Sequence, residues 1–227
     1  MKQKIWVISI GGSRIVPDEV DYEFLERLKN LVESNPSHRF VAVTGGGSTA
    51  RRYIKALRKL NGKKKSQALA GIAITRLHAN FLSRLFGKKA NEEIPRSMEK
   101  VKNLLKKNQV VFCGALRYEK KTTSDGTAAK LAAFLECPFI NLTNVRGLYT
   151  SNPKTNKKAK FISKITWKEF NKIAKRIKFK AGQHFVLDQS AAKIILKKKV
   201  PTYIVGRVKA IEDIIRGKRY SGTFISG

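Results

Sequence analysis

The chain has 227 residues, 42% of them hydrophobic, and carries 48 Lys and Arg against 16 Asp and Glu, a formal net charge of +32. This length and apolar fraction predict one large domain with a substantial core and exclude an intrinsically disordered chain. A charge this large and of one sign attracts polyanions over a distance that the salt concentration sets.

Apolar, β-rich runs alternate with segments of helical periodicity along the chain. Strands are expected at 4–10, 39–44, 109–113, 138–142, 201–205 and 222–226, and helices at 21–33, 48–60, 67–86, 98–107, 125–136, 166–176 and 189–198. Ser97, Ser124 and Asp188 are the expected N-caps of three of these helices. This alternation predicts a largely parallel sheet with helices on both faces and a ligand site beyond the carboxyl ends of the strands.

Glycine runs follow the first two strands. The first strand ends in Gly11-Gly12-Ser13, and the second in Gly45-Gly46-Gly47 before a helix that carries Arg51 one turn on. A backbone without Cβ atoms approaches a ligand closely, and the start of a helix favours phosphate. The runs therefore predict phosphate binding, with an ordinary tight turn as the alternative. Neither run is a Walker loop or a dinucleotide fingerprint.

The positive charge is unevenly placed along the chain. Residues 1–33 carry five Lys and Arg against six Asp and Glu, whereas residues 34–91 carry thirteen cations and no acid. Such a segment suits a polyanion such as RNA. A solvated face in a lysine-rich proteome is the alternative interpretation.

Two later segments carry candidate polar groups. Asp125, in Thr123-Ser124-Asp125-Gly126, opens a helix of small residues, so it is either a helix cap or a carboxylate that orients cations or Mg²⁺ around a phosphoryl group. Tyr149 follows the turn at Gly147 and is either a platform for a base or a core aromatic.

The remaining sequence signals exclude several classes of protein. Cys113 and Cys137 each end an apolar run and are expected to be buried thiols, and no Cys/His spacing suggests zinc. The apolar run at the start of the sequence is too short for a signal peptide or a membrane span. The sequence therefore predicts a soluble cytoplasmic protein with no membrane partner.

As a set, these segments resemble the amino-acid-kinase superfamily, and most closely its archaeal-type UMP (uridylate) kinase branch. The resemblance runs from about residue 4 to 226. It rests on motifs that recur in this order: Ile10-Gly11-Gly12-Ser13, Thr44-Gly45-Gly46-Gly47 through Arg51-Arg52-Tyr53, Gly71-Ile72, Ile74-Thr75-Arg76, Ser124-Asp125, Thr143-Asn144-Val145 with Gly147 and Tyr149, Lys180-Ala181-Gly182, Asp188 with Lys193, and Gly222-Thr223.

The resemblance implies a fold and a reaction. The fold is an α/β, three-layer α/β/α sandwich around a mostly parallel sheet of about eight strands, in one domain of residues 1–227. Residues 1–137 would form the acceptor half and residues 138–227 the ATP half. The reaction is phosphorylation of UMP to UDP with ATP and Mg²⁺, usually in a homohexamer.

The resemblance also assigns residues to this reaction. Gly12 and Ser13 would face the transferred phosphate, Gly46 would contact the UMP phosphate, and Gly47 and Arg51 the ATP phosphates. Thr123 and Ser124 would lie near the acceptor nucleotide, and Asp125 among the catalytic residues. Thr143, Tyr149 and Asn152 belong to the ATP side, and the metal ligands are not assigned.

The chain departs from the family pattern at several positions. Ala68 stands where the family has an aspartate for the UMP ribose, Asn152-Pro153 replaces Asp-Pro, and Ser9 replaces a superfamily lysine. The stretch from Gly114 to Ser124 is longer by about three residues and has gained Arg117, Lys120 and Lys121.

These departures leave two alternatives to a UMP kinase. One is a catalytically degenerate kinase-fold protein that binds RNA or the ribosome through residues 34–91 and 116–121. The other is a kinase for another small phosphate acceptor. The isopentenyl phosphate kinases carry a histidine after the glycine segment, and this chain lacks one there.

Overall fold

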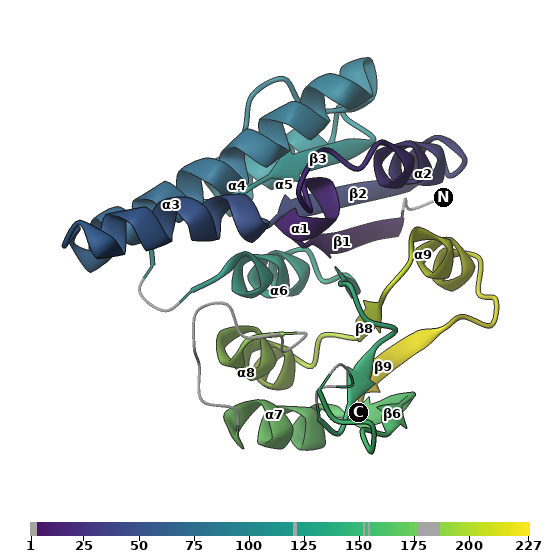
Figure 1. Ribbon diagram of the computed structural model, residues 1–227. Helices are drawn as coiled ribbons and strands as arrows, with labels where there is room; N and C mark the ends of the chain where they lie inside the picture. Colours follow the sequence, from purple (N-terminus) through teal and green to yellow (C-terminus); the bar gives the residue numbers. More distant parts are fainter. Residues whose placement is uncertain (1–3, 120–121, 152, 154, 177–186) are drawn as a thin grey trace.

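The main sheet of the computed structural model has seven strands, and the model describes residues 4–119, 122–151, 153, 155–176 and 187–227. The strands are β1 (Lys4–Ile10), β2 (His38–Thr44), β3 (Val110–Cys113), β4 (Phe139–Leu142), β7 (Lys164–Thr166), β8 (Thr202–Val205) and β9 (Gly222–Ser226). Their order is β3-β2-β1-β4-β8-β9-β7 (Figure 1). Only β8 and β9 run antiparallel to each other, so the predicted mostly parallel sheet is confirmed.

All six predicted strands are present, each within one residue of its expected bounds. The main sheet has seven strands where about eight were expected. A separate antiparallel ribbon joins β5 (Leu148–Tyr149) to β6 (Phe161–Ile162). The sequence did not predict β5, β6 and β7, which are only two or three residues long.

Helices cover both faces of the sheet. They are α1 (Gly12–Ile15), α2 (Tyr22–Glu33), α3 (Gly47–Lys59), α4 (Lys64–Phe86), α5 (Met98–Leu105), α6 (Ser124–Phe134), α7 (Trp167–Arg176), α8 (Gln189–Lys198) and α9 (Val208–Ile215). All seven predicted helices are present, whereas α1 and α9 were not predicted.

The side chains of β1 alternate between two hydrophobic cores. Ile8 and Ile10 pack with residues of α2, α4 and α9 on one face, whereas Val7 packs with residues of α5, α6, α7 and α8 on the other. Because parallel strands buried on both faces need helices on each side, this division produces the three-layer α/β/α sandwich.

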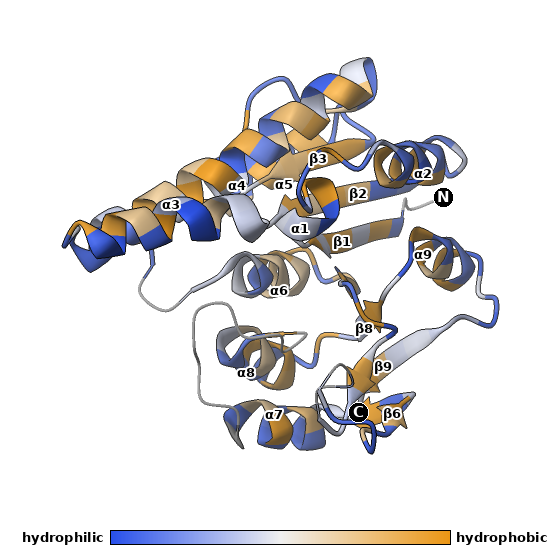
Figure 2. Cartoon of the chain, viewed as in Figure 1, coloured by the Kyte–Doolittle hydropathy of each residue, from blue (hydrophilic) through white to orange (hydrophobic). Residues whose placement is uncertain are grey.

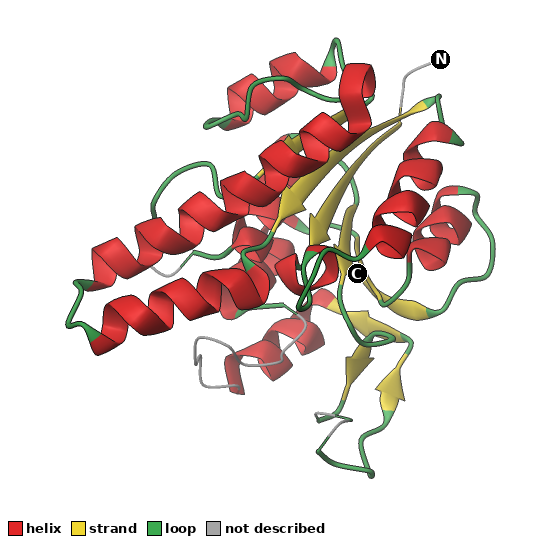
Figure 3. Cartoon of the chain, turned by 45° about the horizontal axis from the view of Figure 1, so that its top comes forward, coloured by secondary structure: helices red, strands yellow, loops and turns green. Residues whose placement is uncertain are grey.

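Helices α3 and α4 form an antiparallel hairpin that extends away from the sheet (Figure 3). Of the residues of α3, only Ala50 is fully buried. Hydrophobic and hydrophilic residues alternate along both helices (Figure 2). Although α4 has 23 residues, no helix in the described parts of the chain is long and apolar enough to span a membrane.

Both cysteines are buried, unpaired thiols, as predicted. Burial raises the pKa of Cys113 and of Cys137 to about 12, so both stay protonated and unreactive near neutral pH.

Candidate functional site

The two glycine runs pack against each other at the carboxyl ends of β1 and β2. These strands are parallel neighbours, and Ile10 is paired with Thr44. A Cβ atom added to Gly12 would lie 2.4 Å from the carbonyl oxygen of Gly45 and 2.4 Å from the nitrogen of Gly47. A Cβ atom on Gly47, whose φ is +59°, would lie 2.4 Å from the carbonyl carbon of Gly12. Neither Gly12 nor Gly47 can carry a side chain in this arrangement, because its Cβ atom would overlap the backbone of the other turn.

The helices that begin at these turns have N-termini without a side-chain cap. Gly11 precedes α1 and Gly46 precedes α3, and neither helix carries an acid in its first turn. Unpaired N–H groups and the positive end of α3 favour an anion there. Arg51 lies one turn into α3 and is exposed, which is the placement predicted for it.

Hydrogen bonds to residues of α4 support the second glycine turn. The ring nitrogen Nδ1 of buried His78 lies 2.8 Å from the carbonyl oxygen of Gly45. The hydroxyl of Thr44 donates to the carbonyl of Thr75 at 2.7 Å, and the hydroxyl of Thr75 accepts from the backbone N–H of Ala115 at 3.0 Å. One helix thus fixes the chain after β2 and after β3.

Helix α6 brings Ser124 and Asp125 to the same place. The hydroxyl of Ser124 lies 3.4 Å from where a Cβ atom on Gly45 would be, so it borders the glycine turn. Asp125 accepts a hydrogen bond of 2.5 Å from the hydroxyl of Ser9 on β1. Gly12, Gly45–Gly47, Ser124 and Asp125 therefore form one site.

Asp125 is not a helix cap. The cap of α6 is Thr123, whose hydroxyl accepts from the N–H of Gly126, so the expectation of Ser124 as the cap was wrong by one residue. Burial raises the pKa of the Asp125 carboxyl to about 7, the hydrogen bond from Ser9 opposes that shift, and the charge of Asp188 adds to it. A carboxyl group placed inside the site with a raised pKa is a candidate functional group.

Thr123 also connects α6 to α8. Its hydroxyl donates to Oδ2 of Asp188, whose Oδ1 accepts from the N–H of Ala191 at 2.9 Å and caps α8 as predicted. The predicted Ser97 cap of α5 is confirmed as well. One hydrogen bond therefore joins the starts of two helices beside the site.

The predicted ATP-side residues lie beyond β4, the strand next to β1. The N–H of Thr143 donates to the carbonyl of Val205 at 2.9 Å. Tyr149 is half-buried, with its ring edge-on to Phe161 at 5.5 Å between centroids. The N–H of Gly11 donates to the carbonyl of Leu142 at 3.5 Å, which ties this side to the first glycine turn. Asn152 and the Lys180-Ala181-Gly182 motif lie outside the described residues.

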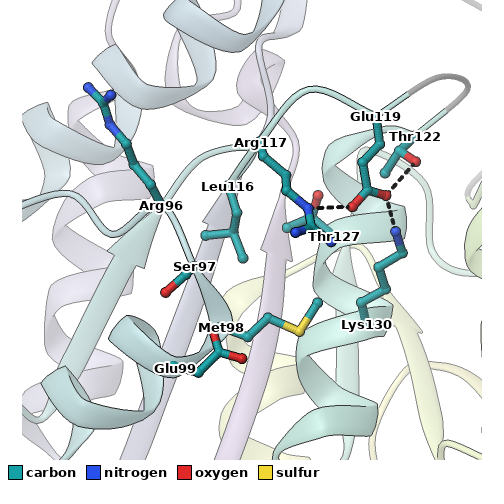
Figure 4. A pocket seen from close by; sticks show the side chains of 10 residues that line it. All are labelled: Arg96, Ser97, Met98, Glu99, Leu116, Arg117, Glu119, Thr122, Thr127 and Lys130. Atoms are coloured by element: carbon teal, nitrogen blue, oxygen red, sulfur yellow. Dashed lines mark hydrogen bonds and ion pairs between the residues drawn. The ribbon is translucent and has the colours of Figure 1, made fainter.

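The stretch from Gly114 to Ser124, which is longer than in the family, is stabilised by an ion-pair network around Glu119 (Figure 4). Glu119 accepts from Arg117 at 2.9 Å, from Lys130 on α6 and from Thr122 at 3.4 Å, and the pKa of its carboxyl is lowered by Lys130 first and Arg117 second. The expected cationic segment 116–121 is thus partly neutralised, because Arg117 is paired with Glu119. Lys120 and Lys121 lie outside the described residues.

Ala68 lies on α4 one turn before Gly71, whose carbonyl is 3.5 Å from where a Cβ atom on Gly46 would be. The methyl group of Ala68 forms no hydrogen bond, at a position where the resemblance implies a carboxylate. Sequence reasoning did not identify His78 and Thr75 as supports of the glycine turn. Thr75 belongs to the Ile74-Thr75-Arg76 motif of the resemblance, whereas the signal for His78 was only a polar side chain among apolar residues of α4.

Comparison with known proteins identifies the family. Residues 4–206 match the model of the amino acid kinase family. The chain is 35% identical to the uridylate kinase of Thermococcus kodakarensis over 96% of this chain and 98% of the relative. It is 34% identical to that of Archaeoglobus fulgidus over 97% and 99%.

The crystal structure of uridylate kinase from Archaeoglobus fulgidus superposes with a TM-score of 0.83 at 33% identity, covering 97% of this chain and 99% of that one. The UMP kinase structure from Ureaplasma parvum, with a TM-score of 0.81 at 21% identity, shares the fold. This chain belongs to the amino acid kinase family, in its archaeal uridylate kinase branch.

Proposed function

We propose that this protein is a uridylate kinase, which transfers the γ-phosphoryl group of ATP to UMP and yields UDP and ADP. The observation that carries the proposal is the pair of interlocked glycine turns, with Arg51 and Asp125 beside them. The relatives that match nearly the whole chain are named uridylate kinases, which supports the same acceptor. Because UMP and ATP are pooled in the cytoplasm, we place the protein there.

The reaction requires little covalent chemistry from the protein. A phosphate oxygen of UMP attacks the γ-phosphorus, and the bond to the β–γ bridging oxygen breaks, so that ADP leaves with that electron pair. The protein contributes in-line placement and stabilisation of charge. Gly12 and Ser13 would hold the transferred group, Gly46 the UMP phosphate, and Gly47 with Arg51 the ATP phosphates.

The two nucleotides would occupy opposite halves of one domain. Thr123 and Ser124, in residues 1–137, would border the acceptor, whereas Thr143 and Tyr149, in residues 138–227, would border ATP. Asn152, which the resemblance adds to the ATP side, lies outside the described residues. β1 and β4 are paired directly, so one continuous sheet supports both halves.

Mg²⁺ would bind to the protein together with ATP. The described residues contain no cluster of three His, Cys, Asp or Glu that could hold a metal by itself. Mg²⁺ is usually held by one or two carboxylates together with substrate phosphates. Asp125 is the carboxyl group that fits this role, and the ion would neutralise charge on the transferring phosphates.

The test is a coupled assay of ATP consumption against a panel of nucleoside monophosphates. UMP should be the preferred acceptor. Ala68→Asp, which restores a carboxylate one turn before Gly71 on α4, should lower the KM for UMP, because one hydrogen bond to a buried polar group is worth about 1–3 kcal/mol. Absence of turnover with every monophosphate would contradict the proposal.

We also infer that the chains self-associate through α4. Four large apolar side chains on this helix are exposed, namely Leu69, Leu77, Phe81 and Leu85, with Leu77 58% exposed. An exposed apolar patch on one element is typical of an interface. Leu77→Asp should lower the mass measured by light scattering, whereas Leu60→Asp, at the tip of the α3–α4 hairpin where Leu60 is 80% exposed, should not.

A further inference from the structure

Helix α3 presents a face of a single sign. At about 100° per residue, its five cations lie within an arc of about 120°, and all are exposed: Arg51, Arg52, Lys55, Arg58 and Lys59. The opposite side packs on α4, where Ile54 lies 3.3 Å from the position of a Cβ atom on Gly71. The cations therefore point away from the partner helix into solvent.

The tip of the hairpin extends this face. Lys63, Lys64 and Lys65 are all exposed and stand at the start of α4, after the three-residue turn 60–62. We call Arg52, Lys55, Arg58, Lys59 and Lys63–Lys65 the hairpin face. Among the described residues, its ion pairing is limited to Arg52 with Asp18, at 3.6 Å and with both side chains largely exposed.

Helix α9 carries its own acids. On α9 and just after it, Lys209 pairs with Glu212 and Asp213, and Arg216 pairs with Glu212. By contrast, residues 34–91 contain no acid, so no acid close in sequence can pair with the cations of α3.

The hairpin face extends beyond the reach of a single bound nucleotide. Arg51 and Lys59 are separated by eight residues, or about 12 Å along the helix, and the tip lies farther still. A nucleic-acid strand carries one phosphate per about 3.4 Å of duplex, so this length matches several consecutive phosphates.

A membrane surface fits this face less well. A helix that lies in a bilayer interface inserts a continuous apolar face. The apolar face of α3, formed by Ala50, Ile54 and Leu57, faces α4 instead. We propose that the hairpin face is a binding surface for duplex RNA, an activity separate from nucleotide phosphorylation.

The test compares two variants with the same net charge. The first is Lys59→Gln, Lys63→Gln, Lys64→Gln and Lys65→Gln on the hairpin face. The matched control is Lys106→Gln, Lys107→Gln, Lys197→Gln and Lys198→Gln. These four lysines are exposed and precede the amino ends of β3 and β8, whereas α3 begins at the carboxyl end of β2. Binding of a 20-base-pair RNA is followed by fluorescence anisotropy from about 50 to 300 mM KCl.

The wild-type affinity should fall steeply with salt. The hairpin variant should lose at least about tenfold in affinity at 150 mM KCl and flatten the log–log slope by up to about 3.6 units, since each of the four phosphate contacts contributes about 0.9. The control variant should stay within about twofold of wild type. Both variants should melt at or above the wild-type temperature, because the substituted side chains are exposed and their removal lowers charge repulsion.

Three results would overturn the proposal. The first is no wild-type binding at 50 mM KCl, and the second is an equal loss in both variants, which would make net charge the only cause. The third is hairpin-dependent binding to vesicles of anionic phospholipid without hairpin-dependent RNA binding.

Discussion

At the scale of single residues, Arg51 and Asp125 are two titratable groups near the glycine turns. Arg51 is exposed, and Asp125 is half-buried beside Ser9. Their surroundings differ, so substitutions at the two positions should affect different measurements.

Arg51→Ala should lower kcat/KM with ATP and UMP by at least about tenfold and leave the melting temperature unchanged. A charge-assisted hydrogen bond to phosphate is worth about 1.5–3 kcal/mol, and the exposed side chain contributes little to folding. Arg58→Ala, two turns farther along α3, is the control and should keep wild-type kinetics. Wild-type turnover in Arg51→Ala would remove this residue from the site.

Asp125→Asn should lower kcat by at least about tenfold with a smaller change in KM, because a carboxylate that orients cations acts as charge develops in the transfer. The same substitution should raise the stability of the folded chain above pH 7, although it lowers turnover. A carboxyl whose pKa is about 7 in the folded chain stabilises that chain at low pH, and this contribution is lost as the pH rises through 7.

The melting temperature of Asp125→Asn relative to wild type should therefore be higher at pH 8 than at pH 5. Asparagine keeps an acceptor for Ser9 and never ionises. Melting curves at both pH values, together with steady-state kinetics, check this. A loss of melting temperature that is equal at pH 5 and pH 8, with kinetics unchanged, would show that Asp125 has only a structural role.

At the scale of elements, Gly47 can be tested against another glycine of positive φ. Gly47 and Gly87 have φ of +59° and +53°, but a Cβ atom on Gly87 would meet nothing within 4 Å. Because Gly87 also has a ψ of −132°, which residues with a side chain rarely adopt at positive φ, Gly87→Ala should cost about 1–3 kcal/mol of unfolding free energy from backbone strain alone.

Gly47→Ala should cost more than Gly87→Ala and should abolish turnover, because its Cβ atom also overlaps Gly12. Urea unfolding and the coupled assay measure both effects. Equal losses of stability in the two variants would mean that the turns can move apart.

The long elements were predictable from sequence, and the short ones were not. The strands β1 and β2 are apolar runs of seven residues that end in glycine. By contrast, β5, β6 and β7 are too short to show a period, and α1 is a single turn that opens with glycine. The helix α9 did carry a signal, since Val208, Ile211 and Ile215 have helical spacing. It was missed although α5, which has the same length of eight residues, was predicted, because Ser97 marks the start of α5 and no capping side chain marks the start of α9.

The sequence predicted the position of the part of the candidate site that the backbone forms. Glycine runs at strand ends identified the turns, and the topology brought them together. His78 and Thr75 support the turn through hydrogen bonds to residues more than thirty positions away. No local pattern encodes such a contact, so only the fold reveals it.

At the scale of the whole molecule, the net charge of +32 should weaken the folded state at low ionic strength. Like charges repel more strongly in the compact chain, and salt screens them over about 10 Å at 0.1 M. The melting temperature should therefore rise between about 10 and 500 mM NaCl.

The rise should be smaller in the variant with four glutamines at positions 59 and 63–65, because those lysines are clustered. Differential scanning calorimetry at both salt concentrations measures it. A melting temperature that falls with NaCl would indicate that ion pairs outweigh repulsion in this chain.

The interlocked turns also limit how this protein can evolve. Gly12 and Gly47 each exclude a side chain because of the backbone of the other. Glycine is already the smallest residue, so no second substitution at the partner position can compensate for the first. A library selected for a new acceptor should return glycine at both positions whatever acceptor is chosen, whereas position 68, which lies one turn from Gly71 on α4, is free to change with it.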